Sequence, residues 1–342
     1  MLNKKAGQFT VYLFTSTDDT GILQHGKYGV PDRNHGYATD DNARALILAV
    51  QLYEIYEKKK YLKLINIYLS FLNHALNDKG MFKNFMGYQR LFLEEQGSED
   101  CYGRCLWALC RTLSSPAVPQ NMKNTCTCLL KEAFKNVNNL SSPRAKAYAI
   151  VGMSYLEKTE DLIRDISQLS DSLVVQYQEY SNDSWKWYEN SLSYGNAFLP
   201  WALSCAHRYL QKEIYYEIAL ESMTFLENIV LKEEYFKPIG CNGWLIKGQK
   251  PALYDEQPIE ASEMLMACLE FYKMTGDRGY LEQAKKCKDW YLGSNSLDKN
   301  MIDDETGACY DGITEQGINL NQGAESSISY GLATINAPDF KK

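Results

Sequence analysis

Two short stretches of the chain combine adjacent carboxylates with an arginine, just where a run of small and apolar residues begins. The two sets are Asp40, Asp41 and Arg44 in HGYATDDNAR, and Glu99, Asp100 and Arg104 in GSEDCYGRC. Paired carboxyl groups suit cleavage of a glycosidic bond, because one can protonate the leaving oxygen while another activates water or attacks the sugar. The two stretches therefore predict a site for general acid and base chemistry.

Similar polar groups stand where four later apolar stretches begin. They are Arg144, Glu189, Tyr194, Asn196, Asp255, Glu256, Gln257, Glu260, Asn321, Gln322 and Glu325. If these starts meet at one mouth, they line a single cleft, and the positive ends of the helices stabilise anionic groups there. We predict that Asp41 and Asp100 form one side of a catalytic site and that Glu189 or Glu256 forms the other.

The remaining groups at these starts are predicted to bind substrate, by holding sugar hydroxyls, orienting the carboxylates or stacking on a pyranose ring. This predicted binding set is His35, Tyr37, Asp40, Arg44, Glu99, Arg104, Arg144, Trp187, Tyr194, Asn196, Asp255, Gln257, Gln322 and Glu325.

Each group also has a structural interpretation. Acidic residues at a helix start can act as caps, and the spacings Asp41–Arg44 and Asp100–Arg104 suit ion pairs along one helix face. His35 suits a polar scaffold, and Trp187 suits a hydrophobic core. Capping alone does not require arginine, amide and tryptophan at five or six starts, so the joint pattern favours chemistry.

The elements that must position these groups are helices. Six stretches are apolar on most sides, as in residues 41–56, and they alternate with stretches that keep one polar face, as in residues 211–230. The apolar helices are expected to begin near Asp40, Asp100, Arg144, Asn196, Glu260 and Glu325. The amphipathic helices are expected over roughly 61–77, 119–137, 160–178, 211–230 and 278–292.

This alternation predicts an all-α (α/α)6 barrel, a toroid of six helical hairpins, with long loops at one mouth. We expect one domain over residues 1–342. The chain ends too soon after Leu332 for a sixth outer helix, so residues 1–17 are expected to close the ring. The run FTVYLF within them also suits a short strand.

Local signals mark several helix starts. Thr39 with the two following aspartates is expected to cap the first apolar helix, and Ser142 with a proline in the first turn is expected to cap the third. Pro258 predicts the start of the fifth apolar helix. Pro200 predicts either the start of the fourth or a kink within it.

Composition excludes several classes of function. The chain has a net charge of −7 and no long Lys/Arg cluster, which argues against nucleic acid and against an anionic membrane surface. No stretch approaches 18 unbroken apolar residues. The ten cysteines include no CxxC pair, and the four histidines show no ligand spacing, so we predict no metal site, no cofactor and free thiols in a reducing, cytoplasmic compartment.

Six segments together resemble a known group of bacterial carbohydrate-active proteins. They are HGYATDDNARAL, SEDCYGRCLWAL, SPRAKAYAIVGM, WYENSLSYGNAFLPWAL, YDEQPIEASEML and TGACYDGITEQGINLNQGAES. The chain is similar, over about residues 17–335, to the six-hairpin glycosidase-like domain that occurs alone or after glycosyltransferase domains. The resemblance implies the (α/α)6 barrel, a role in glycan metabolism and a glycosyltransferase partner. Tyr102 and Gly195 depart from the group, where relatives tend to have His and Asp.

We predict a glycoside hydrolase that acts on an oligosaccharide, either a mannoside or a glucoside. A sugar epimerase or isomerase on the same fold is one alternative, although that chemistry usually uses histidine pairs inside the barrel. A non-catalytic glycan-binding module of a glycosyltransferase system is another, and the two departures from the group favour it.

Overall fold

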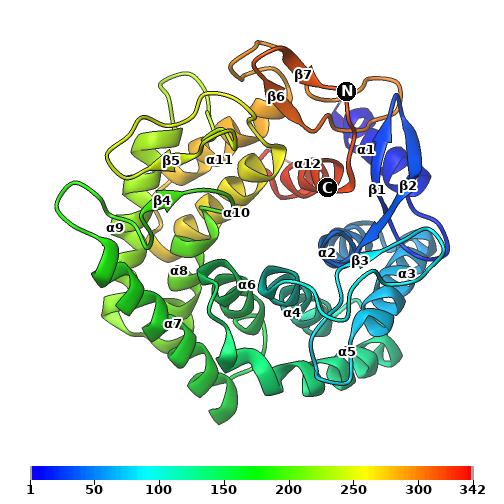
Figure 1. Ribbon diagram of the computed structural model, residues 1–342, viewed down its shortest axis with the longest axis horizontal. Coiled ribbons are helices and arrows are strands. Elements are labelled where there is room, and N and C mark those ends of the chain that lie inside the picture. The colour runs from blue at the N-terminus through cyan, green and yellow to red at the C-terminus, as the bar shows by residue number, and fades with distance from the viewer. Residues whose placement is uncertain (1, 340–342) are drawn as a thin grey trace. The chain divides into compact units, whose positions relative to one another are not determined.

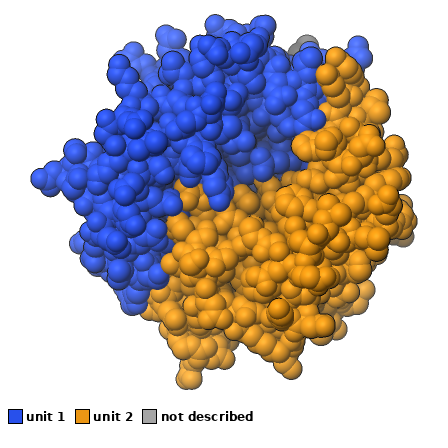
Figure 2. Space-filling model, viewed as in Figure 1, with its two compact units in different colours: residues 1–12, 170–341 blue, residues 13–169, 342 orange. Residues whose placement is uncertain are grey.

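The computed structural model describes residues 2–339, and their contacts form two compact units. Unit 2 comprises residues 13–169, and unit 1 comprises the remainder of the described chain (Figure 2). Each unit holds both the apolar and the amphipathic helices that the sequence predicts. The two units are described in turn.

Unit 2 is built around three buried helices. The middle one, α4, packs against α2 and α6, and the three lie side by side (Figure 1). Helix α3 covers α2 and α5 covers α4. Their polar residues recur every three or four positions, so each presents one apolar face to the buried helix beneath it. The bounds are α2 (Thr39–Tyr56), α3 (Lys59–Ala75), α4 (Glu99–Ser114), α5 (Gln120–Ala133), η1 (Phe134–Asn139), α6 (Pro143–Met153) and α7 (Glu160–Tyr180), the last of which continues into unit 1.

Unit 1 repeats this arrangement. Helix α10 packs against α8 and α12, while α9 covers α8, and α11 contacts both α10 and α12. The bounds are α8 (Phe198–Leu210), α9 (Glu213–Val230), α10 (Pro258–Thr275), α11 (Gly279–Tyr291) and α12 (Ala324–Asn336). The predicted starts of the six apolar helices therefore agree with the structure to within about two residues.

The N-terminal segment is a helix, α1 (Leu2–Thr15), so the alternative of a short strand at FTVYLF is wrong. The ring of Phe9 meets the ring of Tyr330 on α12 edge to face at 6.2 Å, and the Tyr12 hydroxyl donates to the Gln322 carbonyl at 2.7 Å. These contacts attach the start of α1 to α12. Closure of a ring by residues 1–17 stays a prediction.

Long loops precede the buried helices and carry small antiparallel sheets. In unit 2, β1, β2 and β3 form one sheet, with Leu23 opposite Tyr37 and Tyr37 opposite Met86. In unit 1, β4 pairs with β5 and β6 pairs with β7. The bounds are β1 (Leu23–Lys27), β2 (Val30–Ala38), β3 (Phe85–Met86), β4 (Ser191–Leu192), β5 (Leu245–Ile246), β6 (Gly312–Thr314) and β7 (Gly317–Asn319).

The helix starts are built in different ways. Ser142 caps α6 by accepting from the Ala145 amide, as predicted, and Ser98 caps α4. The predicted cap of α2 is wrong, because its N-cap is Ala38, and the Thr39 hydroxyl donates to the carbonyls of the 83–84 loop. The first turn of α2 is buried against this loop, so the Thr39 hydroxyl binds the loop carbonyls and does not cap the helix.

The prolines lie in first turns. Pro143 and Pro258 begin α6 and α10, and Pro200 is the third residue of α8. The first four N–H groups of a helix have no acceptor within the helix, so a proline at these positions removes no helical hydrogen bond. Pro200 therefore does not break α8.

All ten cysteines are free. Eight are buried, Cys241 is half-buried, and Cys128 on α5 is exposed. Burial raises the pKa of thiols such as Cys101 and Cys268, which keeps them protonated.

Candidate active site at the helix N-termini

The N-terminal ends of α2, α4 and α6 bring a charged cluster together in unit 2. The Arg44 guanidinium contacts Asp40 at 3.0 Å and Asp41 at 3.2 Å on its own helix. Arg104 of α4 reaches across to Asp40 at 3.7 Å. The predicted i,i+3 pair between Asp41 and Arg44 is present, and Asp40 is held from two helices at once.

Arg104 also contacts α6. Its Nη2 donates to the Tyr148 hydroxyl at 2.8 Å, and its guanidinium lies 4.6 Å from the centre of the Tyr148 ring. Stacking and hydrogen bonding to one tyrosine restrict the plane of the guanidinium. Tyr148 thus orients an arginine that faces the acidic pair.

Two carboxylates of α4 bind the start of α6. Glu99 accepts from the backbone amides of Ser141 at 2.8 Å and Ser142 at 2.6 Å. Asp100 accepts from the Ser142 hydroxyl at 2.7 Å. The same serine therefore caps α6 and orients Asp100.

The cluster is largely shielded from solvent. Asp41 is 7% exposed, Asp100 is 8% exposed, and both arginines are as buried. Arg144, the second residue of α6, is 3% exposed. Charges interact more strongly in such surroundings than in water, so this cluster can stabilise charge that develops on a substrate.

Tyr102, the first departure from the related proteins, does not belong to this cluster. Its hydroxyl donates to the Ala133 carbonyl at 2.5 Å, and its ring lies 6.1 Å from that of Phe82. The departure therefore falls at a packing contact between α4 and α5.

The corresponding ends in unit 1 use different chemistry. Glu260, in the first turn of α10, accepts from the Gly195 amide at 2.6 Å and from the Asn196 side chain at 3.4 Å. Gly195, the second departure, has φ of +57°, a left-handed conformation that favours glycine. Here a backbone amide and the Asn196 side chain hold the carboxylate, and the predicted substrate-binding role of Asn196 stays a prediction.

Glu256 is enclosed completely, with 0% exposure. Its carboxylate accepts from the Trp290 indole at 3.0 Å and from the Ser296 hydroxyl, and Lys237 lies 3.6 Å away. Three segments far apart in sequence thus converge on one carboxylate. This geometry favours a role in holding the loops together, while the predicted catalytic role stays a prediction.

The segment before α12 positions two further predicted residues. The Gln322 side chain is fully buried and donates to Asp303 at 3.2 Å, and Glu325 is half-buried in the first turn of α12. Asp311 accepts from the Gly323 amide at 2.7 Å and from the Asn321 side chain. Asp303 and Asp311 were missed by the sequence argument, because they belong to an irregular loop with no periodic pattern.

Other predicted residues of unit 1 lie around these ends. Glu189 is half-buried and its carbonyl accepts from the Trp185 indole at 2.8 Å, while Tyr194 is exposed. Asp255 and Gln257 are half-buried on either side of Glu256, and Asp255 has φ of +63°.

Three predicted residues have placements that favour a structural interpretation. Trp187 is fully buried against Tyr188, so its faces are closed to a sugar. Tyr37 is also fully buried, and its hydroxyl donates to Asp18 at 2.6 Å. His35 is exposed on β2, 3.5 Å from the Asp32 carboxylate.

Tyr148 and Ser142 are functional candidates that the sequence argument did not name. Tyr148 stands four residues after Arg144 on α6, on the same helix face, which is a signal that could have indicated it. Ser142 was recognised as a cap but not as a partner of Asp100.

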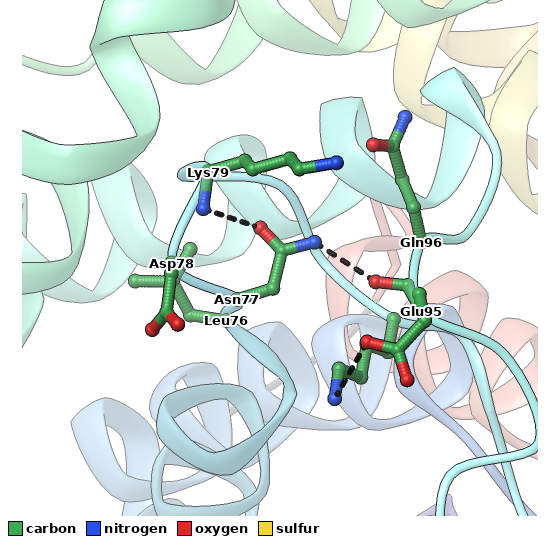
Figure 3. Close-up of a pocket in the computed structure, with 7 residues that line it drawn as sticks. Leu76, Asn77, Asp78, Lys79, Glu95 and Gln96 are labelled. Atoms are coloured by element: carbon green, nitrogen blue, oxygen red, sulfur yellow. Dashed lines mark hydrogen bonds and ion pairs between the residues drawn. The ribbon is translucent and has the colours of Figure 1, made fainter.

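A separate cavity of about 310 Å3 opens in the loop between α3 and α4 of unit 2 (Figure 3). Asn77 organises this loop by accepting from the Lys79 amide at 3.0 Å and donating to the Glu95 carbonyl at 2.9 Å. Lys83 and Glu95 form a loose, exposed ion pair at 3.8 Å. The two acids that line this cavity, Asp78 and Glu95, are both exposed, so they do not form a buried acidic pair.

Two general features concern the described residues. Among residues 2–339, no three His, Cys, Asp or Glu side chains gather in a way that could hold a metal ion. In that same part of the chain, none of the helices has the length and apolar character needed to cross a bilayer.

No protein-family model matches the chain, and no curated protein matches it in sequence. Solved structures do match over nearly the whole chain. A sugar epimerase from a ruminal bacterium has a TM-score of 0.75 at 13% identity, with 100% of both chains covered. D-mannose isomerase has a TM-score of 0.72 at 14% identity, covering 98% of this chain and 96% of the other.

An α-1,6-mannanase of Salegentibacter, solved as an inactive variant with two adjacent aspartates replaced and in complex with α-1,6-mannotetrose, has a TM-score of 0.66. It is 13% identical, and 98% of each chain is covered. At such identities the likeness shows the fold, and the predicted all-α (α/α)6 barrel is confirmed.

Proposed function

We propose that this protein is a glycoside hydrolase acting on an oligosaccharide, with a mannoside or a glucoside as substrate. The observation that carries the proposal is the buried cluster at the starts of α2, α4 and α6. There Asp41 and Asp100 are each oriented by a side chain, Arg44 for the first and Ser142 for the second. Two oriented carboxyl groups are the minimum that glycosidic bond cleavage requires.

The roles follow from the contacts. Asp41 faces an arginine, so its anionic form is stabilised, and we assign to it activation of water or attack on the sugar. Within unit 2 the proton donor is then Asp100, which the Ser142 hydroxyl orients. The catalytic roles of Glu189 and Glu256 in unit 1 stay predictions. Of these two glutamates, the half-buried Glu189 is open to a substrate, whereas the Glu256 carboxylate faces protein donors.

The arginines of the cluster supply the remaining functions. Arg44 and Arg104 hold Asp40 and Asp41 in place, and Arg144 at the start of α6 supplies a further guanidinium for sugar hydroxyls. Planar guanidinium groups with several N–H donors suit recognition of vicinal hydroxyls and carboxylates.

The structural comparison supports a glycan substrate. The Salegentibacter mannanase binds mannotetrose, and its variant without two adjacent aspartates is inactive. Asp40 and Asp41 of this chain are also adjacent and lie in the first turn of a buried helix. The shared fold makes the same substrate class a reasonable first choice.

A sugar epimerase is the second candidate, because an epimerase and an isomerase share the fold. That chemistry abstracts a proton next to a carbonyl, and histidine usually performs it. His25 and His35 lie on the β1–β2 hairpin, whereas His74 and His207 lie in the last turns of α3 and α8. No histidine stands in the first turn of a buried helix within the described chain, which favours the hydrolase.

One experiment separates these functions. The protein is incubated in D2O with manno- and gluco-oligosaccharides, and the products are followed by NMR. Release of shorter sugars without deuterium at carbon supports the hydrolase. Deuterium at the carbon next to the carbonyl without cleavage overturns it in favour of the epimerase, and binding without any turnover favours a non-catalytic module.

Two further assignments extend the proposal. We place the protein in the cytoplasm, since ten free cysteines suit a reducing compartment. A glycosyltransferase partner follows from the resemblance of the sequence segments. Co-purification of the untagged partner from cells would test it.

A further inference from the structure

A second cavity, of about 520 Å3, lies within unit 1. Three segments form it: the turn at residues 182–185, one face of α9 and the loop at residues 245–251. None of its lining residues belongs to the predicted catalytic or binding set. The volume lies within the range of sites for small ligands and accommodates one or two sugar units.

Helix α9 provides one wall through a single face. Phe225, Asn228 and Ile229 lie on this face at spacings of three and four residues, and Lys232 follows just beyond the end of the helix at Val230. An apolar ring and an amide from the helix, and an ammonium group from the segment after it, therefore line this side of the cavity.

An aromatic corner forms the apolar part of the cavity. The Trp185 ring meets the Phe225 ring edge to face at 5.3 Å, and the indole N–H donates to the Glu189 carbonyl. This bond fixes the tryptophan, and Pro251 adds a further apolar surface. Because Trp185 is only 5% exposed, the half-buried Phe225 ring and Pro251 supply the accessible apolar surface, and such a surface matches the C–H face of a pyranose ring.

The charges in the cavity are all positive. Lys247 donates to the Tyr180 carbonyl at 2.7 Å, and Lys232 donates to the Ile229 carbonyl at 2.8 Å, so each ammonium is positioned and retains further N–H donors. Within the described chain, neither ammonium has a carboxylate within 4.0 Å, and no acid lines the cavity. In a chain with a net charge of −7, two lysines without acids favour an anionic ligand.

The loop that carries Lys247 is held in place. The Lys247 backbone amide donates to the Asn190 carbonyl at 2.8 Å, next to the β4–β5 pair. The Gln249 backbone amide donates to the Ile246 carbonyl at 2.9 Å and so forms a turn. Gly248 in this turn has φ of +83°. The loop thus presents Lys247 and Gln249 from fixed backbone positions.

We propose that this cavity is a binding site for an anionic saccharide, a pyranose that carries a carboxylate or a phosphate. The aromatic corner contacts the sugar face, the amides of Asn228 and Gln249 bind hydroxyls, and the two lysines bind the anionic substituent. The proposal does not rest on the hydrolase assignment, because the lining residues are separate from that site.

The test is a titration of the full chain, by calorimetry, with four probes: digalacturonate, mannose 6-phosphate, neutral mannobiose and inorganic phosphate. We expect an anionic sugar to bind more tightly than mannobiose or phosphate alone, and more weakly as salt is raised. Comparison of digalacturonate with mannose 6-phosphate identifies the anionic group. Lys247→Gln and Lys232→Gln should each weaken binding roughly tenfold, the loss of one charged hydrogen bond.

Matched controls make the outcome decisive. Lys250→Gln removes the same charge from an exposed position in the same loop that does not line the cavity, and it should leave the affinity unchanged. Gln249→Ala tests the site without touching a charge, in case a lysine variant fails to fold. The proposal is overturned if mannobiose binds as tightly as the anionic sugars, or if neither lysine variant weakens the binding of an anionic sugar. Loss of binding in Asp41→Asn alone would place the ligand in the candidate active site and also overturn it.

Discussion

The two units place carboxylates at the starts of their buried helices and hold them by different means. In unit 2, arginines from α2 and α4 contact Asp40 and Asp41, and Ser142 holds Asp100. In unit 1, Glu260 is held by a backbone amide and an asparagine, and Glu256 by an indole, a hydroxyl and a lysine.

The distribution of arginine explains this difference. Residues 170–339 contain only Arg208 and Arg278. Arg208 lies in the last turn of α8 and Arg278 just before α11, so neither stands at the start of a buried helix. Guanidinium groups at the starts of buried helices are therefore confined to unit 2, where they can stabilise anions. In unit 1 the Glu260 carboxylate is set among neutral donors, and Glu256 has a lysine beside two neutral donors.

The largest expected effect is on turnover in unit 2. Asp41→Asn keeps the shape of the side chain and removes its charge, so under the proposed hydrolase function we expect the rate of oligosaccharide cleavage to fall by roughly a thousandfold. Thermal unfolding should stay within a few degrees of that of the parent protein. Asp161→Asn, at an exposed ion pair at the start of α7, is the control and should retain full activity. Near-parental turnover in Asp41→Asn would remove this residue from the mechanism.

The next effect is on the stability of unit 1. Glu256→Gln puts an amide N–H2 group among three donors, so we expect the free energy of unfolding to fall by about 3 kcal/mol. Urea titration measures this loss. Asp255→Asn is the control, because asparagine tolerates the left-handed backbone at that position, and it should stay within about 0.5 kcal/mol. A loss of turnover without a loss of stability would instead restore the catalytic role predicted for Glu256.

Arg104 tests whether geometry or charge matters in unit 2. Arg104→Lys keeps the charge and loses the planar group that stacks on Tyr148 and reaches Asp40, so kcat/KM should fall roughly tenfold to a hundredfold. The same substitution at Arg111, which pairs with Glu54 at the other end of α4, should leave kcat/KM unchanged. If the two variants behave alike, the position of Arg104 has no special role.

The smallest effect is a pH dependence of stability in unit 1. Burial raises the pKa of Glu227 on α9 to about 7, with Asp277 adding repulsion and a hydrogen bond from Gln283 opposing the shift. Because the folded state binds the proton more tightly than the unfolded chain, this residue should lower stability as pH rises from about 4.5 to 7. We expect a loss of about 1 to 2 kcal/mol over that window.

Glu227→Gln should remove this component, so thermal unfolding between pH 5 and pH 8 should change less than in the parent protein. Glu217→Gln, an exposed residue on the same helix, is the control and should keep the parental profile. Parallel profiles for all three proteins would show that Glu227 does not couple folding to pH.

Much of the architecture could be predicted from the sequence, because periodicity of apolar residues reports burial directly. The six apolar stretches differ from the five amphipathic ones within single helices, as in α2 and α9, and no long-range information is needed. FTVYLF was ambiguous because a short apolar run suits a helix or a strand equally. Its packing against α12 decided the outcome.

The site was predictable where partners are close in sequence. Arg44 follows Asp41 by one turn, so their pairing is a property of the helix. Two partners of Glu256 lie 34 and 40 residues away, on α11 and in the loop after it, and those of Arg104 include Tyr148, 44 residues away. Such contacts depend on which helices are neighbours, and a local pattern does not contain that information.

The burial of the cysteines has a practical consequence. A maleimide reagent at neutral pH attacks an accessible thiolate, and eight of the ten cysteines are buried. Cys128 is exposed on the surface of α5, so the native chain already contains one preferred attachment point for a dye or spin label. A reporter placed there could follow unit 2 during oligosaccharide binding without any engineered substitution.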